Sequence, residues 1–191
     1  MTRSSTPAWP QRLISELDAS DRRAEQLGRG LTTAQLNWSG RPGAWSVGQC
    51  LDHLLVTNNV YLPAIAAALV GQPRSPVQEV TIGFWTRRFI KQYVAPLTTE
   101  TGSRTRAPKK IKPAAEVNVG VLDDLLRSNV VARELVTKAS DYDVNRLRFK
   151  NPFIPLLRFT VGAGLEIVAK HESRHLAQAE RVRQSSGFPR V

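Results

Sequence analysis

The stretch LEIVAKHESRHLAQAERV, residues 165–182, decides how the rest of the chain is interpreted. It is strongly helical, and its periodicity predicts a helix over about residues 159–183. His171 and His175 stand four residues apart in it, so their side chains share one face of the helix. That face is also the apolar inner face, where a buried neutral imidazole needs a partner at each ring nitrogen. A metal ion at one nitrogen and a carbonyl or carboxylate at the other would meet this need.

The third and last histidine of the sequence, His53, lies in a second helical stretch, WSVGQCLDHLLVTNN at residues 45–59. Ser46 and Gln49 form a capping box that predicts the start of this helix. His53 falls on the flank of the apolar stripe and so faces a groove between helices. Two imidazoles four residues apart and a third from a neighbouring helix give a three-nitrogen site with an open position, as in catalytic zinc sites. We therefore expect the three histidines to form a metal site, rather than to be ordinary core or surface residues.

Two further amphipathic stretches complete a set of four helices. The apolar spacing predicts helices over about residues 10–27 and 117–139, in addition to those that begin at Ser46 and near residue 159. The segment of residues 71–116 contains five prolines and is too long for a tight turn. We predict an all-α fold, a four-helix bundle with one long crossover between helices 2 and 3, and no strand of any length.

The chain length of 191 residues is most simply explained by a single domain over residues 1–191, with the bundle core at about 9–185. Within the crossover, FWTRRFIKQYV at residues 84–94 combines aromatic and basic residues at helical spacing. Such a helix could dock on a membrane surface, but we favour its packing as a lid over the end of the bundle.

Composition limits the cellular setting and the partners. The single cysteine excludes an internal disulfide and indicates a reducing cytoplasm. Residues 1–13 lack the apolar core of a signal peptide, and no apolar run approaches the ~18 residues of a membrane span. The net charge of +11 favours acidic small molecules, nucleic acid or anionic membranes, and much of it lies in one segment: Arg104, Arg106, Lys109, Lys110 and Lys112. Nucleic acid is not favoured, because no aromatic–basic sheet motif or recognition helix accompanies this charge.

The sequence HESRH, residues 171–175, also matches the H-E-x-x-H pattern of zinc proteases, in which the glutamate is the general base. A protease is not favoured, because sixteen residues follow the motif and Glu180 is the only acid among them. Glu172 is still the candidate general base, able to accept a proton from water or a thiol at the metal. The alternative is a surface carboxylate that pairs with Arg174 or Lys170.

Cys50 lies one turn before His53 and is a candidate fourth ligand or thiol nucleophile. Such a cysteine is more often a small buried apolar group, and we favour that role. Asp52 is expected on the outward side of the same helix.

Three segments together resemble the DinB/YfiT-like superfamily of bacterial four-helix-bundle metalloproteins. They are WSVGQCLDHL at residues 45–54, KNPFIPLLRFTVGAGLEIVAKH at 150–171 and KHESRHLAQAERV at 170–182. The resemblance covers most of the chain, from about Trp9 to Pro189, and rests on the three histidines and their order. It implies a bundle with one long crossover and a divalent metal ion (zinc, nickel, iron or manganese) held by His53, His171 and His175.

Characterised members of this superfamily include transferases and isomerases that use low-molecular-weight thiols such as bacillithiol, mycothiol or glutathione, and several are dimers. The resemblance therefore implies a cytoplasmic, metal-dependent enzyme that transfers a thiol to an electrophilic small molecule. Arg133 and the basic segment of the crossover would bind the carboxylates of the thiol. The alternatives are a metal-dependent hydrolase and a non-catalytic, stress-related protein that binds a metal or a small molecule. We expect a small-molecule substrate and no nucleic-acid or membrane partner, and allow for a homodimer.

Overall fold

The computed structural model describes residues 7–94 and 108–190. Four long helices form a bundle: α1 (Ala8–Gly28), α3 (Val47–Ala67), α5 (Val121–Ala139) and α6 (Val161–Gln184). The shorter elements are α2 (Thr33–Asn37), α4 (Phe84–Phe89), the π-helical turn η1 (Ile90–Val94), the 3-10 turn η2 (Lys109–Ile111) and the strands β1 (Arg148–Lys150) and β2 (Arg158–Thr160). The crossover between α3 and α5 occupies residues 68–120. The predicted all-α four-helix bundle with one long crossover is confirmed.

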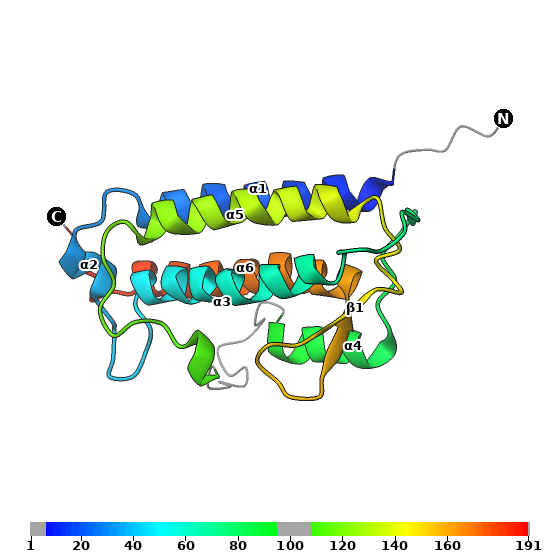
Figure 1. Ribbon diagram of the computed structural model, residues 1–191. Coiled ribbons are helices and arrows are strands. Elements are labelled where there is room, and N and C mark those ends of the chain that lie inside the picture. Colours follow the sequence, from blue (N-terminus) through cyan, green and yellow to red (C-terminus); the bar gives the residue numbers. More distant parts are fainter. Residues whose placement is uncertain (1–6, 95–107, 191) are drawn as a thin grey trace.

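The bundle has two layers, α1 with α5 and α3 with α6 (Figure 1). Each of α1 and α3 packs against both α5 and α6, so α1 and α3 are diagonal to one another. On the other side of the α3–α6 layer, away from α1 and α5, lie α4 and the hairpin of β1 and β2 (Figure 1). None of the described helices is long and apolar enough to cross a lipid bilayer.

Side-chain caps mark the starts of α2, α3 and α6. The Ser46 hydroxyl accepts a hydrogen bond from the Gln49 backbone N–H, and the Gln49 side chain accepts one from the Ser46 N–H, as the capping box predicts. The expected start of the third helix at residue 117 is wrong, because Asn37 of α2 binds both the N–H and the carbonyl of Val117 at 2.8 Å. This pairing takes the backbone of Val117 out of the helix, and α5 begins at Val121.

A short antiparallel hairpin contradicts the expectation that the chain has no strands. Phe149 of β1 pairs with Phe159 of β2, and both side chains are buried, whereas Arg148, Lys150 and Arg158 beside them are exposed. The Phe149 ring also lies so close to α6 that a methyl group on Gly164 would meet it at 2.6 Å. Three-residue strands are too short to show an alternating pattern in the sequence, which is why the hairpin was missed.

The core consists of two apolar clusters separated by a layer of buried polar side chains. One cluster contains Leu13, Leu17, Ile65 and Leu165, and the other contains Leu51, Leu54, Leu125 and Leu176. Between them, every bundle helix contributes a buried polar residue: Ser20 from α1, Asn58 from α3, Ser128 and Asn129 from α5, and Glu172 from α6. We call this set, with the adjacent Asp21, the polar layer.

A second buried acid ties α6 to α1 within the first apolar cluster. The Glu166 carboxylate accepts hydrogen bonds from Arg12 of α1 and from Lys170, one turn further along α6 at 2.5 Å. Burial by itself raises the pKa of Glu166, but the bonds from Lys170 and Arg12 outweigh this effect, so the pKa lies below its ordinary value. Folding is therefore linked to the ionised form of Glu166.

We expect Glu166→Gln to lower the free energy of unfolding at neutral pH by about 1–2 kcal/mol, because Arg12 and Lys170 lose a charged acceptor. A pKa lowered on folding contributes stability above the ordinary glutamate range, and this contribution is lost as the pH falls below that range. Urea unfolding at about pH 7 and about pH 3 should therefore show a difference between wild type and variant that shrinks in acid. The exposed partner of Arg12 provides the control, since Glu16→Gln should change stability by less than about 0.5 kcal/mol. An equal loss at both pH values would contradict the linkage.

Candidate metal centre

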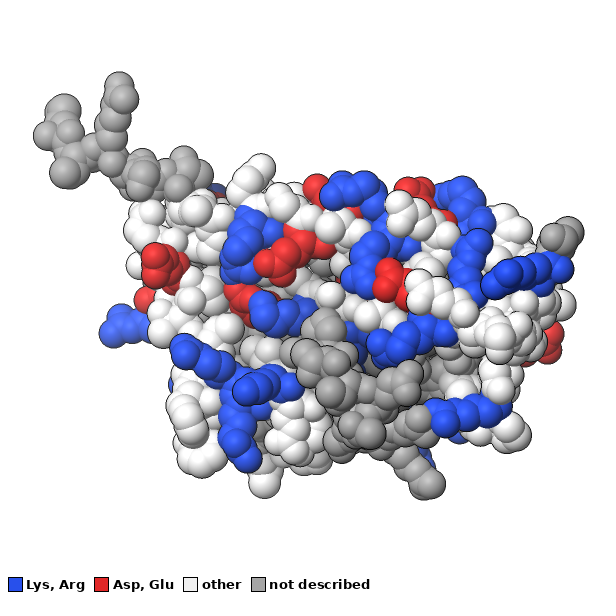
Figure 2. Space-filling model, turned by 180° about the vertical axis from the view of Figure 1, so that it is seen from behind, with Lys and Arg blue, Asp and Glu red and all other residues white. Residues whose placement is uncertain are grey.

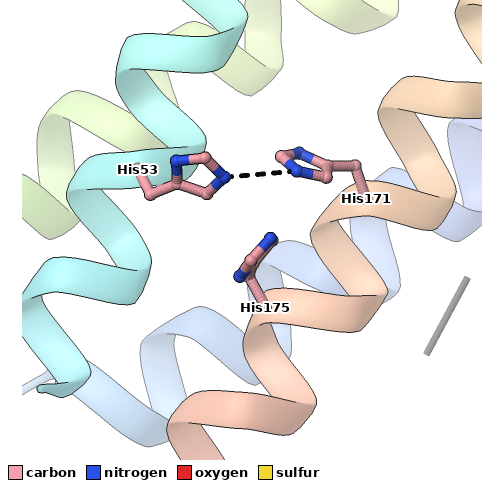
Figure 3. Close-up of side chains that lie close together, drawn as sticks. All are labelled: His53, His171 and His175. Carbon is pink, nitrogen blue, oxygen red and sulfur yellow. Dashed lines mark hydrogen bonds between the residues drawn. The ribbon is translucent and has the colours of Figure 1, made fainter. Parts of the chain in front are cut away.

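The three histidines of the sequence meet between α3 and α6 (Figure 3). The Nε2 atoms of His53 and His171 are 3.2 Å apart, and the ring centroids of His53 and His175 are 4.4 Å apart. One ring nitrogen from each histidine lies within 4.8 Å of the other two. His53 and His175 are buried, whereas His171 is partly exposed and gives the group its open side.

The nitrogens on the far side of two rings are held by hydrogen bonds. His53 Nδ1 is 2.6 Å from the carbonyl oxygen of Ile111 in the crossover. A carbonyl only accepts, so Nδ1 carries the proton in the neutral ring and Nε2 presents a lone pair to the centre. His175 Nδ1 lies 3.1 Å from the side-chain Oε1 of Gln178, an arrangement that favours the same tautomer. Such outer contacts fix the orientation of metal-binding imidazoles.

Burial lowers the pKa of all three histidines. For His171 and His175, the neighbouring imidazoles and the charge of Arg174 lower it further. The rings are therefore neutral at physiological pH, as metal ligands must be. Two nitrogens bound to one ion at about 2.1 Å are roughly 3.4 Å apart in a tetrahedral site, close to the observed separation of 3.2 Å. The donor set fits one divalent ion, and the pair of His53 and His171 already has the spacing that such an ion requires.

The crossover is attached to α3 next to the site. The backbone N–H of Ala114 donates to the Asp52 carboxylate at 2.8 Å, and the Gln49 side chain donates to the Ala114 carbonyl at 3.0 Å. These bonds hold the nearby Ile111 carbonyl against His53. Asp52 thus faces the crossover rather than only solvent, which the helix periodicity alone did not indicate.

Three residues beside the histidines were not identified as site residues from the sequence. The indole of Trp45 packs on His53 and His175, with ring centroids 4.7 and 5.5 Å away, and forms a wall of the site. Gln178 could have been found from its position three residues after His175, on the same side of α6. The Ile111 carbonyl could not, because a main-chain acceptor leaves no signature in the sequence.

Glu172 belongs to the polar layer. Its carboxylate oxygens accept hydrogen bonds from Asn58 at 3.4 Å and from Asn129 at 3.2 Å. Burial raises the pKa of Glu172 to about 8; the bond from Asn58 opposes the shift and the charge of Asp21 adds to it. The alternative interpretation as a surface carboxylate is wrong, since Glu172 is 1% exposed. Its role as general base stays a prediction.

Other polar candidates are paired within the bundle. Arg133 donates to Asp21 at 2.6 Å and lies 3.4 Å from Asp18, so its guanidinium binds carboxylates of α1. Glu180 binds Arg23 of α1 through two hydrogen bonds of 2.9 Å, which agrees with its exclusion as a metal ligand.

Cys50 is fully buried in the second apolar cluster, and burial raises the pKa of its thiol to about 12. The thiol is therefore protonated at neutral pH. Among the described residues, the group able to hold a metal consists of the three histidines without Cys50. This placement matches the favoured role of a small apolar core residue. Of the basic segment, Arg104 and Arg106 lie outside the described residues.

Comparisons with known proteins give the family from a family model and the fold from a solved structure. The family model of the DinB superfamily matches residues 16–179. A search of curated proteins gives no match. Among solved structures, the chain is similar to YfiT from Bacillus subtilis, with 15% sequence identity and a TM-score of 0.63 over 99% of this chain and 94% of that chain. That protein is described as a probable metal-dependent hydrolase with an unusual four-helix bundle topology. At this identity the likeness shows a shared fold.

We expect Glu172→Ala to lower the free energy of unfolding by about 2–3 kcal/mol, because Asn58 and Asn129 each lose a buried acceptor. Glu172→Gln keeps a carbonyl oxygen in place and should cost less. Urea unfolding of both variants measures the difference, with Glu134→Ala on the exposed face of α5 as the control. Wild-type stability of Glu172→Ala would contradict the anchoring role.

Proposed function

This chain belongs to the DinB superfamily, and on that premise we propose that it is a metal-dependent enzyme in which His53, His171 and His175 bind one divalent ion. The observation that carries the proposal is the convergence of three neutral imidazoles, two of them oriented by hydrogen bonds on their outer nitrogens. Such an arrangement supplies three ligands and leaves room for a further one, which is typical of catalytic rather than structural sites.

A divalent ion supplies Lewis acidity, which lowers the pKa of a neighbouring water or thiol so that it becomes a nucleophile near neutral pH. The chain's own residues orient and enclose this chemistry. Ile111 and Gln178 fix the imidazole rings of His53 and His175, and the indole of Trp45 keeps water from one side. The partly exposed His171 marks the side from which a substrate enters.

We place hydrolysis of a small electrophilic substrate first. A three-histidine ligand set with an open position is the arrangement that activates water in zinc hydrolytic chemistry. The description of the structurally similar YfiT points to the same class.

Transfer of a low-molecular-weight thiol is the second candidate, and one observation favours it. Lys109, Lys110 and Lys112 are exposed and flank Ile111, the residue whose carbonyl binds His53. Their charge would attract the carboxylates of an anionic thiol toward the site. Arg133 is not assigned the role of binding the carboxylates of the thiol, because its guanidinium is paired with Asp18 and Asp21.

Protein purified without a histidine tag should contain about one divalent ion per chain by elemental analysis. His53→Ala and His175→Ala should each lower the metal content at least about tenfold, since a two-histidine remnant binds weakly. Circular dichroism should show unchanged helical content, because both apolar clusters stay intact. Asn59→Ala, at an exposed position of α3, is the control and should retain the ion. Full occupancy in His175→Ala would contradict the three-histidine site.

Turnover should require both the ion and an electrophilic substrate. We would assay esters, amides, epoxides and haloarenes with metal-loaded and chelator-treated protein, each with and without bacillithiol, mycothiol or glutathione. Metal-dependent product formation without thiol supports the hydrolase, and an absolute requirement for a thiol supports the transferase. If the protein retains the metal tightly but turns over no substrate, with or without any of the thiols, the proposal of an enzyme is contradicted and a binding protein is favoured.

A further inference from the structure

The short helix α4 leaves two of its three aromatic side chains in solvent. Phe84 is 72% and Trp85 78% exposed, and their rings contact each other edge to face. The following residues anchor the segment on the bundle, because Ile90 is buried and the Phe89 ring packs on Phe159 of β2. Residues 89–94 thus pack on the bundle, as expected for a lid, whereas Phe84 and Trp85 do not. The contacts of Phe89 and Ile90 hold α4 in place, and the side chains of Phe84 and Trp85 remain exposed to solvent.

The exposed charged residues of this segment and of the hairpin that it contacts through Phe89 are all basic. Residues 84–94 and 148–158 contain six basic residues and no acidic one, and all six are exposed: Arg87, Arg88, Lys91, Arg148, Lys150 and Arg158. We call the surface of these two segments the basic aromatic face. At the lower left of Figure 2, where the turned view brings α4, basic and uncharged atoms gather without acidic ones. Its charge complements an anionic partner.

The hairpin adds a second apolar projection on the same side of the bundle (Figure 1). Leu156 is fully exposed and Ile154 is 38% exposed. Leu156 also has a φ of 67°, in the left-handed region that disfavours residues with a side chain. An exposed leucine in strained backbone is unfavourable within the described fold, and strain of this kind is concentrated at functional surfaces.

We propose that the basic aromatic face docks on the surface of an anionic lipid bilayer. Phe84 and Trp85 would insert at the level of the headgroups, where aromatic side chains are favoured, and the surrounding arginines and lysines would bind the lipid phosphates. This inference is independent of the metal site. It replaces the expectation that the chain has no membrane partner, and no membrane-spanning segment is involved.

Charge and chemistry favour a bilayer over the other occupants. A second copy of the chain, paired through the same face, would bring two sets of six cations together. Single-stranded nucleic acid would match the charge and the aromatic rings, but the aliphatic side chains of Ile154 and Leu156 offer no stacking surface for bases. A bilayer matches the cations, the aromatic pair and the aliphatic side chains together, because it presents anionic headgroups above an apolar interior.

The test is co-sedimentation of the full chain with phosphatidylcholine vesicles, with and without phosphatidylserine. We expect binding to the anionic vesicles that weakens with salt. Phe84→Ala/Trp85→Ala should lower the partition coefficient at least about tenfold. Arg87→Gln/Arg88→Gln/Lys91→Gln should lower it roughly a hundredfold, at about fivefold for each charge. Trp85 fluorescence should shift to the blue on binding, and Trp85→Phe should abolish the shift while retaining most of the binding.

Two matched controls separate this face from general charge and hydrophobicity. Val130→Ala/Val131→Ala removes two exposed apolar side chains of α5, and Arg22→Gln/Arg41→Gln/Lys138→Gln removes three exposed charges elsewhere. Both should change binding less than about threefold, because they lie outside the docking surface. Equal binding to both kinds of vesicle, or equal losses in the face and control variants, would overturn the proposal. Self-association or oligonucleotide binding that requires Trp85, without vesicle binding, would also overturn it in favour of that partner.

Discussion

A carboxyl group buried at the centre of a helical bundle must find hydrogen-bond partners, and most of this structure depends on how Glu172 obtains them. Asn58 reaches it from α3 and Asn129 from α5, while Asn129 also binds Asp21 of α1. The network therefore joins all four helices at one level. A sliding or rotation of any helix would leave an amide or a carboxylate unpaired in the core, which costs more than most apolar contacts supply. Apolar packing alone tolerates such shifts more easily.

This fixed register places the histidines. Glu172 and His171 are adjacent in α6, and Asn58 follows His53 in α3 by little more than one turn. The hydrogen bond from Asn58 to Glu172 therefore aligns the two ligand-bearing segments. The crossover completes the arrangement from the opposite side. Its Ile111 carbonyl orients His53, and its Ala114 is bound by Asp52 and Gln49 of the same helix. The site thus depends on a polar layer behind it and a docked loop in front of it.

The sequence allowed the bundle and the histidine group to be predicted because both follow from local spacing. Apolar periodicity identifies helices, and an i, i+4 histidine pair shares a face whatever surrounds it. The environment of Glu172 could not be predicted in the same way. The Glu172 side chain projects from the helix about 100° away from that of His171. Only the packing of α1 and α5 decides whether a side chain in this direction meets the core or the solvent. The start of α5 was missed for a similar reason, since Asn37 holds Val117 through a contact between distant parts of the chain.

The distribution of the core also determines what a metal ion would contribute to the fold. Apolar clusters lie on both sides of the polar layer, so the bundle has a complete core without any ligand. By contrast, small zinc domains depend on the ion for folding. Here, however, the neutral His53 ring directs an Nε2 lone pair toward His171 within a buried site, where a lone pair without a donor or an ion is costly. An ion that binds the native state alone would relieve this cost and raise stability in proportion to the logarithm of its concentration. An ion bound there would therefore add stability to a bundle whose two apolar clusters do not include the histidines.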